Sequence, residues 1–95
     1  MALEPLVERA LVEAASRLSL SPQGLAKARR ILEQVPNPPG GPLRDHVGAA
    51  AFIALVVTGG STDESGGARR LGLSLSQLRK SQAQIAARVS VGILD

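Results

Sequence analysis

One segment of the sequence, residues 64–84, holds side chains whose types and spacing suit recognition of nucleic acid. Two arginines precede Gly72, and a stretch rich in serine, glutamine and basic residues follows it. Arginine and lysine bind phosphate and guanine, and glutamine matches adenine, so this segment offers partners for both the backbone and the bases of DNA. The candidate DNA-binding residues are Arg69, Arg70, Ser74, Ser76, Gln77, Arg79, Lys80, Ser81 and Gln84.

The spacing of three small or apolar residues in the same segment predicts a helix-turn-helix. Two short helices cross steeply only where their contact is small and their turn is tight. Ala68 supplies the small contact, Gly72 the turn, and Leu78 the anchor of the second helix. We therefore expect a helix-turn-helix over about residues 61–89, whose second helix enters the major groove of DNA.

The candidate residues have different expected roles within that motif. Those expected to face base edges or nearby phosphates are Ser74, Ser76, Gln77, Lys80 and Ser81. The two arginines of the first helix are expected to contact the phosphate backbone, which orients a protein on DNA without reading its sequence. The alternative interpretation is a charged face that contacts only solvent, formed by Arg69, Arg70, Arg79 and Lys80.

Apolar residues recur with helical spacing along the rest of the chain, so we expect an all-α fold. Serines at positions 21, 61 and 74 are expected to start three of the helices, with capping-box spacing at 61–64 and at 74–77. Gly72 is expected to end the fourth helix in a left-handed conformation. The five expected helices span about residues 2–18, 22–35, 43–57, 61–71 and 74–89.

The third of these helices has no polar face in its middle. Residues 47–57 are all apolar or glycine. A helix that is apolar all round is surrounded by other helices, so we expect it to be the central one. Gly48 and the alanines at 49–51 would let its neighbours cross closely.

Length and composition limit the remaining possibilities. Ninety-five residues fit one domain, residues 1–95, built around a single core. Phe52 is the only aromatic residue, so the core must consist of leucine, valine, isoleucine and alanine. With no cysteine and a single histidine, neither disulfides nor a zinc site is expected, and we expect no cofactor or metal. The net charge of +3 suits a polyanionic partner but is also ordinary for a soluble domain.

The sequence contains no arrangement that predicts catalysis. Asp45 and His46 are adjacent, but we interpret them as the polar first turn of a helix, where Asp45 favours the helix dipole. Residues 59–62 could bind an anion through backbone N–H groups, although helix capping is the expected use. No nucleophile elbow or phosphate-binding loop accompanies them, so we do not expect an enzyme.

The apolar content of the chain does not predict a membrane protein. The longest purely apolar run, Ala49–Val57, is about half the length of a membrane-spanning helix. The first residues lack the basic and apolar regions of a signal peptide. We therefore expect a cytoplasmic, nucleoid-associated protein with no membrane partner.

Several stretches of sequence together resemble a known family. They are residues 15–21 leading into 26–32, the Gly41-Pro42 pair, the alanine-rich run 49–54, and Leu71-Gly-Leu-Ser-Leu-Ser-Gln-Leu-Arg79. Five helices with a buried, alanine-rich third helix and a final helix-turn-helix resemble the cyclin-like repeat. The resemblance is greatest to the second core repeat of archaeal transcription factor B, and it spans about residues 8–89.

This resemblance implies a five-helix cyclin-like domain that binds promoter DNA beside the TATA box. Its implied partners are double-stranded DNA, TATA-binding protein and RNA polymerase, and its implied role is transcription initiation. Carried over by position, the DNA-facing residues are Ser74, Gln77, Arg79 and Lys80.

The sequence departs from that family in four respects. It has no zinc ribbon, and it holds one repeat where the family core has two. Gly66 and Gly67 stand where an acidic and an apolar residue are usual, and each costs the helix about 1 kcal/mol relative to alanine. Ser81 and Gln82 replace bulkier residues.

Two other functions fit the same sequence. Cyclin-like folds also hold partner proteins on their helix surfaces, so the chain could be a protein-interaction module without DNA binding. Many helix-turn-helix proteins are dimers that present two recognition helices, so a homodimeric regulator is the third possibility.

Overall fold

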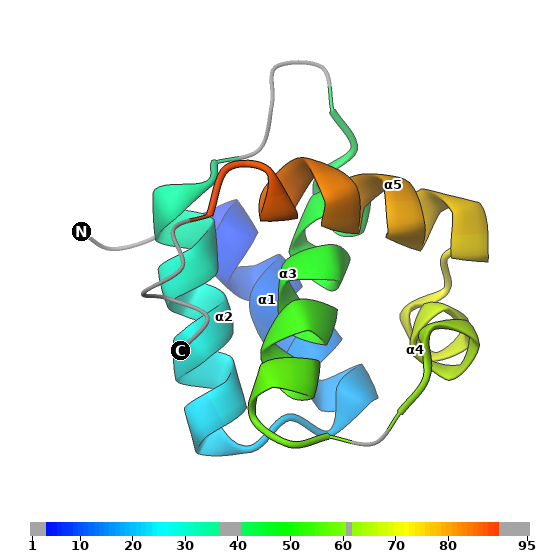
Figure 1. Ribbon diagram of the computed structural model, residues 1–95. Coiled ribbons are helices and arrows are strands. Elements are labelled where there is room, and N and C mark those ends of the chain that lie inside the picture. The colour runs from blue at the N-terminus through cyan, green and yellow to red at the C-terminus, as the bar shows by residue number, and fades with distance from the viewer. Residues whose placement is uncertain (1–3, 37–40, 61, 90–95) are drawn as a thin grey trace.

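The described part of the chain, residues 4–36, 41–60 and 62–89 of a computed structural model, contains helices and no strands (Figure 1). The expected all-α class is therefore confirmed. Ala2 and Leu3, expected to begin the first helix, lie outside the described residues. The helices are α1 (Pro5–Leu18), α2 (Pro22–Gln34), α3 (Leu43–Val57), α4 (Glu64–Leu71) and α5 (Leu75–Ala86).

Helix α3 is the centre of the fold, with α1, α2 and α5 packed against it. Ala49, Ala50 and Ala51 have no exposed surface, which lets these helices approach closely. The expectation of a helix buried on all sides is confirmed along most of α3 but is wrong for its last turn. Val56 and Val57 are 49% and 38% exposed where α3 leads into a surface turn.

Helices α1 and α2 are joined by a tight turn and by an ion pair. Ser19 adopts a left-handed conformation with φ of 56° and ends α1. Away from this turn, both carboxylate oxygens of Glu8 in α1 accept hydrogen bonds from the side chain of Arg29 in α2, one of them at 3.2 Å from Nε. The hydrogen bond to Glu8 raises the pKa of Arg29 above its ordinary value. Both side chains are partly exposed, so this pair contributes little to stability.

The expected caps of α2 and α5 are confirmed. The hydroxyl of Ser21 accepts a hydrogen bond from the backbone N–H of Gly24 at 3.0 Å. At α5, the hydroxyl of Ser74 accepts from the N–H of Gln77 at 3.0 Å, and Oε1 of Gln77 accepts from the N–H of Ser74 at 2.8 Å. Ser74 and Gln77 therefore form the reciprocal capping box that their spacing predicts.

The expected cap of α4 is wrong. The helix begins at Glu64, and its cap is Asp63, whose Oδ1 accepts a hydrogen bond from the N–H of Gly66 at 2.7 Å. Ser61, the expected cap, lies outside the described residues. Aspartate caps a helix as well as serine does, and its negative charge also favours the helix dipole.

Asp45 and His46 lie in the first turn of α3, as expected, but both are buried. Nε2 of His46 donates a hydrogen bond to the carbonyl oxygen of Val35 at 2.7 Å. Val35 caps the C-terminal end of α2, where helix carbonyls have no partner within the helix. His46 therefore connects the end of α2 to the start of α3.

Replacing His46 by phenylalanine tests this structural role. A somewhat larger aromatic ring replaces the imidazole, and the buried carbonyl of Val35 loses its donor, so the free energy of unfolding should fall by about 1–3 kcal/mol. Urea denaturation followed by circular dichroism measures this change. As a control, Arg30→Ala on the exposed face of α2 should change stability by no more than about 0.5 kcal/mol. An H46F variant as stable as the original protein would show that this hydrogen bond contributes nothing.

Candidate nucleic-acid interface

Helices α4 and α5 meet at a sharp corner, residues 71–74, which we call the Gly72 corner. Gly72 has a left-handed conformation with φ of 74° and ends α4, as expected. The N–H of Leu73 donates to the carbonyl of Ala68 at 2.9 Å, and the N–H of Gly72 donates to the carbonyl of Arg69 at 3.2 Å, which together form a Schellman motif. Figure 1 shows α4 nearly end-on while α5 runs across the view, so the chain changes direction abruptly here.

The two helices of the corner are anchored by Ala68 and Leu78, as the sequence predicts, and also by Leu71. Ala68 and Leu71 of α4 and Leu78 of α5 are all buried, with 2%, 5% and 0% of their surface exposed. Leu73 is partly buried and packs against the same core. The corner is therefore held from inside by small and aliphatic side chains, and its polar residues are left to the outside.

Gly67 has a packing role that sequence reasoning missed. A Cβ atom at this position would lie 2.5 Å from two ring carbons of Phe52, so only glycine lets α4 approach α3 this closely. A Cβ atom at Gly66 would instead meet Oδ1 of Asp63 at 2.9 Å, so the carboxylate that caps α4 would have to shift, but no buried side chain would. The sequence predicted only a loss of helix propensity at both glycines, because the contact with Phe52 is made across the fold.

Most of the candidate DNA-binding residues lie on the surface. The exposed ones are Arg69, Arg70, Ser74, Ser76, Gln77, Arg79, Lys80 and Gln84. Ser81 was expected to face DNA, but this prediction is wrong because the residue is only 8% exposed. It is three residues after Leu78 and four before Ile85, so it belongs to the inner face of α5.

The capping box restricts what two of the exposed residues can read. The hydroxyl of Ser74 and Oε1 of Gln77 are already engaged in capping α5. Bidentate recognition of adenine by glutamine uses both the oxygen and the nitrogen of the amide. Reading adenine through Gln77 would therefore draw on the oxygen that caps the helix.

An ion pair across the corner partly occupies Arg79. Its Nε lies 3.5 Å from Oε2 of Glu64, and both side chains are well exposed. Such a surface pair is weak and opens easily. Among the described residues, Arg69, Arg70 and Lys80 form no ion pair.

Two further arginines, which sequence reasoning did not select, lie at the Gly72 corner. A Cβ atom at Gly72 would be 3.6 Å from Nη2 of Arg44 and 3.7 Å from Nη1 of Arg17. Arg17 belongs to the last turn of α1 and Arg44 to the first turn of α3. No local signal in the sequence joins them to positions 69–72, because only the packing of α1, α3 and α4 brings them there.

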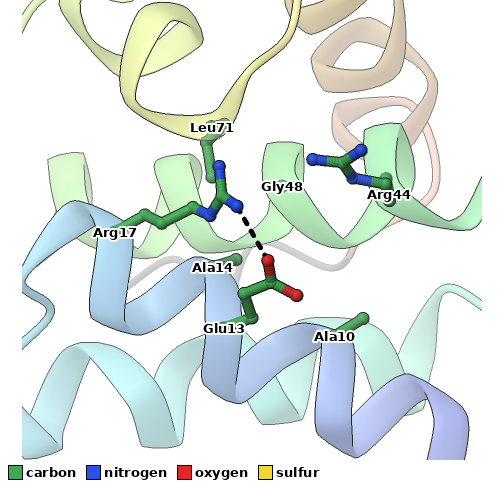
Figure 2. Close-up of a pocket in the computed structure, with 7 residues that line it drawn as sticks. All are labelled: Ala10, Glu13, Ala14, Arg17, Arg44, Gly48 and Leu71. Atoms are coloured by element: carbon green, nitrogen blue, oxygen red, sulfur yellow. Dashed lines mark hydrogen bonds and ion pairs between the residues drawn. The ribbon is translucent and has the colours of Figure 1, made fainter.

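Arg17 and Arg44 line a small cavity beside the corner (Figure 2). Its volume is about 30 Å³, and its other walls come from α1, α3 and the end of α4. Arg17 donates a hydrogen bond to Oε1 of Glu13 at 2.9 Å. The remaining lining residues are Ala10, Ala14, Gly48 and Leu71.

Metal sites and membrane-spanning helices are both absent from the described residues. No group of three or more histidine, cysteine, aspartate or glutamate side chains there could hold a metal ion. None of the described helices has both the length and the apolar character needed to cross a membrane. Comparison with known proteins found no family model, curated protein or solved structure that matches this chain.

The paired glycines of α4 allow a matched test of its packing. Gly67→Ala should lower the free energy of unfolding by about 1–3 kcal/mol, because the new methyl group meets the buried ring of Phe52. Gly66→Ala should have a smaller effect, because its gain in helix propensity offsets part of the weakened cap at Asp63. Both changes are measured by urea denaturation. Equal effects at the two positions would show that α4 does not lie as close to α3 as described.

Proposed function

We propose that this chain is a DNA-binding domain in which α4 and α5 form a helix-turn-helix. The observation that carries the proposal is the Gly72 corner, which buries Ala68, Leu71 and Leu78 and leaves a polar flank of α5 exposed. Arg69 and Arg70 lie on the last turn of α4 beside that flank. This combination suits a protein that positions itself on phosphates and presents one helix to a groove.

The exposed face of α5 offers the groups that would meet the bases. Ser76, Lys80 and Gln84 recur every four residues and lie in one exposed row, opposite the buried face of the helix. Serine, lysine and glutamine all form hydrogen bonds to base edges in the major groove. In this proposal α5 reads DNA through that row, and the arginines at the end of α4 bind the phosphate backbone.

The resemblance to the cyclin-like repeat of transcription factor B extends the proposal to a role. The order of five helices, with a buried alanine-rich α3 in the centre, is compatible with that fold. On this interpretation the target is promoter DNA, and TATA-binding protein and RNA polymerase are the implied partners. These partners rest on the sequence resemblance alone.

A second candidate function is a cyclin-like protein-interaction module. Val56 and Val57 at the end of α3, and Leu6 and Val12 on α1, are large apolar side chains with 38–67% of their surface exposed. They would favour a protein partner where they form one continuous patch, since apolar residues scattered singly are common on protein surfaces. Such binding would depend little on salt, whereas DNA binding weakens steeply as salt rises.

The test of DNA binding is a charge reversal at the end of α4. Fluorescence anisotropy should show that the original protein binds a labelled DNA duplex at 50 mM salt with a Kd of about 10⁻⁴ M or tighter. In the double variant R69E/R70E, affinity should fall by at least about tenfold. The slope of log K against log salt should fall by about 1.8, since each lost phosphate contact contributes about 0.9.

The matched control is the double variant R9E/R30E, which makes the same change in net charge on exposed positions of α1 and α2. It should bind DNA much more tightly than R69E/R70E does. Circular dichroism checks that both variants remain helical. Absence of binding by the original protein, or equal losses in the two double variants, would contradict the proposal and favour the interaction module.

A further inference from the structure

The guanidinium groups of Arg17 on α1 and Arg44 on α3 lie beside the Gly72 corner at the end of α4, and they line a small cavity there. Arg17 and Arg44 each come within 3.7 Å of where a Cβ atom at Gly72 would lie. Figure 2 shows Arg17 pointing from α1 toward Leu71, and Arg44 lying along α3 near Gly48. We call these two arginines, with the cavity that they line, the arginine cradle.

The size of the cradle limits what can occupy it. Its volume of about 30 Å³ exceeds the roughly 10–15 Å³ that one water molecule needs, but it is far below the several hundred cubic ångströms of a small-molecule site. Its floor is made of small or aliphatic residues, and a Cβ atom at Gly48 would already lie 3.2 Å from Leu73. The cradle can therefore admit one or two oxygen atoms of an anion, but not a nucleotide or a coenzyme.

The charges around the cradle favour an anion. Arg17 is paired with Glu13 at 2.9 Å, whereas Arg44 forms no ion pair within the part of the chain that the structure describes. One carboxylate thus faces two guanidinium groups, and Arg69 and Arg70 add positive charge on the adjoining turn of α4. An oxyanion between the two guanidinium groups would relieve their mutual repulsion and accept their hydrogen bonds.

We propose that the arginine cradle binds a phosphate of the DNA backbone, so that the interface extends from α4 and α5 onto α1 and α3. This inference rests on the proposed function, since it assigns a further contact to the same DNA complex. Arg44 makes the principal contact because its guanidinium is not committed to any carboxylate of the described residues. Arg17 assists it while remaining paired with Glu13.

The first experiment removes the charge of Arg44. DNA affinity of the variant R44Q should fall by about eightfold at 0.1 M salt, and the salt slope should fall by about 0.9, as for one phosphate contact. The loss should be the same for duplexes of different sequence, because a phosphate carries no sequence information. The control R30Q, an exposed arginine of α2, should retain both the original affinity and the original slope.

The outcomes separate this inference from the proposed function. If the original protein binds no DNA, both are wrong. If R69E/R70E binds more weakly than its control but R44Q binds as the original protein does, only the arginine cradle is wrong. If R44Q lowers the midpoint of urea unfolding but not the affinity, Arg44 stabilises the C-terminal end of α4 instead, and the inference is overturned.

A second experiment distinguishes DNA phosphate from free phosphate. Inorganic phosphate at matched ionic strength should displace the labelled duplex no better than chloride does, because the cradle alone binds a single ion weakly. Displacement by phosphate that exceeds the effect of chloride, and that is lost in R44Q, would assign the cradle to free phosphate and overturn its assignment to the DNA strand.

Discussion

The close approach of helices to α3 is the constraint on which the rest of this structure depends. With Phe52 as its only aromatic residue, the chain cannot fill wide gaps between helices with large side chains. Its core therefore needs short distances, which the fully buried alanines at 49–51 provide for the helices packed on α3. Gly67 extends the same principle to α4, whose backbone lies directly against the ring of Phe52. Dense packing of small groups replaces the bulk of aromatic side chains.

The position of the proposed interface follows from that packing. Because α4 packs against α1 and places Gly67 on the ring of Phe52 in α3, its last turn lies beside the end of α1 and the start of α3, and Arg17 and Arg44 come to lie at the Gly72 corner. The left-handed glycine then redirects the chain into α5. The packing of α4 against α1, α3 and α5 thus brings the positive charge of Arg17 and Arg44 to the corner from which α5 starts.

At the start of α5, the side-chain atoms that cap the helix are also ones that could bind DNA bases. Ser74 and Gln77 cap the helix through the same atoms that would otherwise meet DNA. Ser76, Lys80 and Gln84 have no such commitment among the interactions of the described residues, and they share one exposed row. Ser74 and Gln77 therefore cap α5, and the row of Ser76, Lys80 and Gln84 is available to a partner.

The sequence by itself determined what depends on near neighbours along the chain. The helix class, the caps at Ser21 and Ser74 and the glycine corner at 72 all follow from residues within about four positions of one another, which is the reach of a helical hydrogen bond. Even the start of α4 differed only because another good cap, Asp63, lies close by. Contacts between distant segments were decided by the tertiary structure alone. The burial of His46, the requirement for glycine at 67 and the meeting of Arg17 with Arg44 each depend on how whole helices pack, which no local pattern of residues encodes.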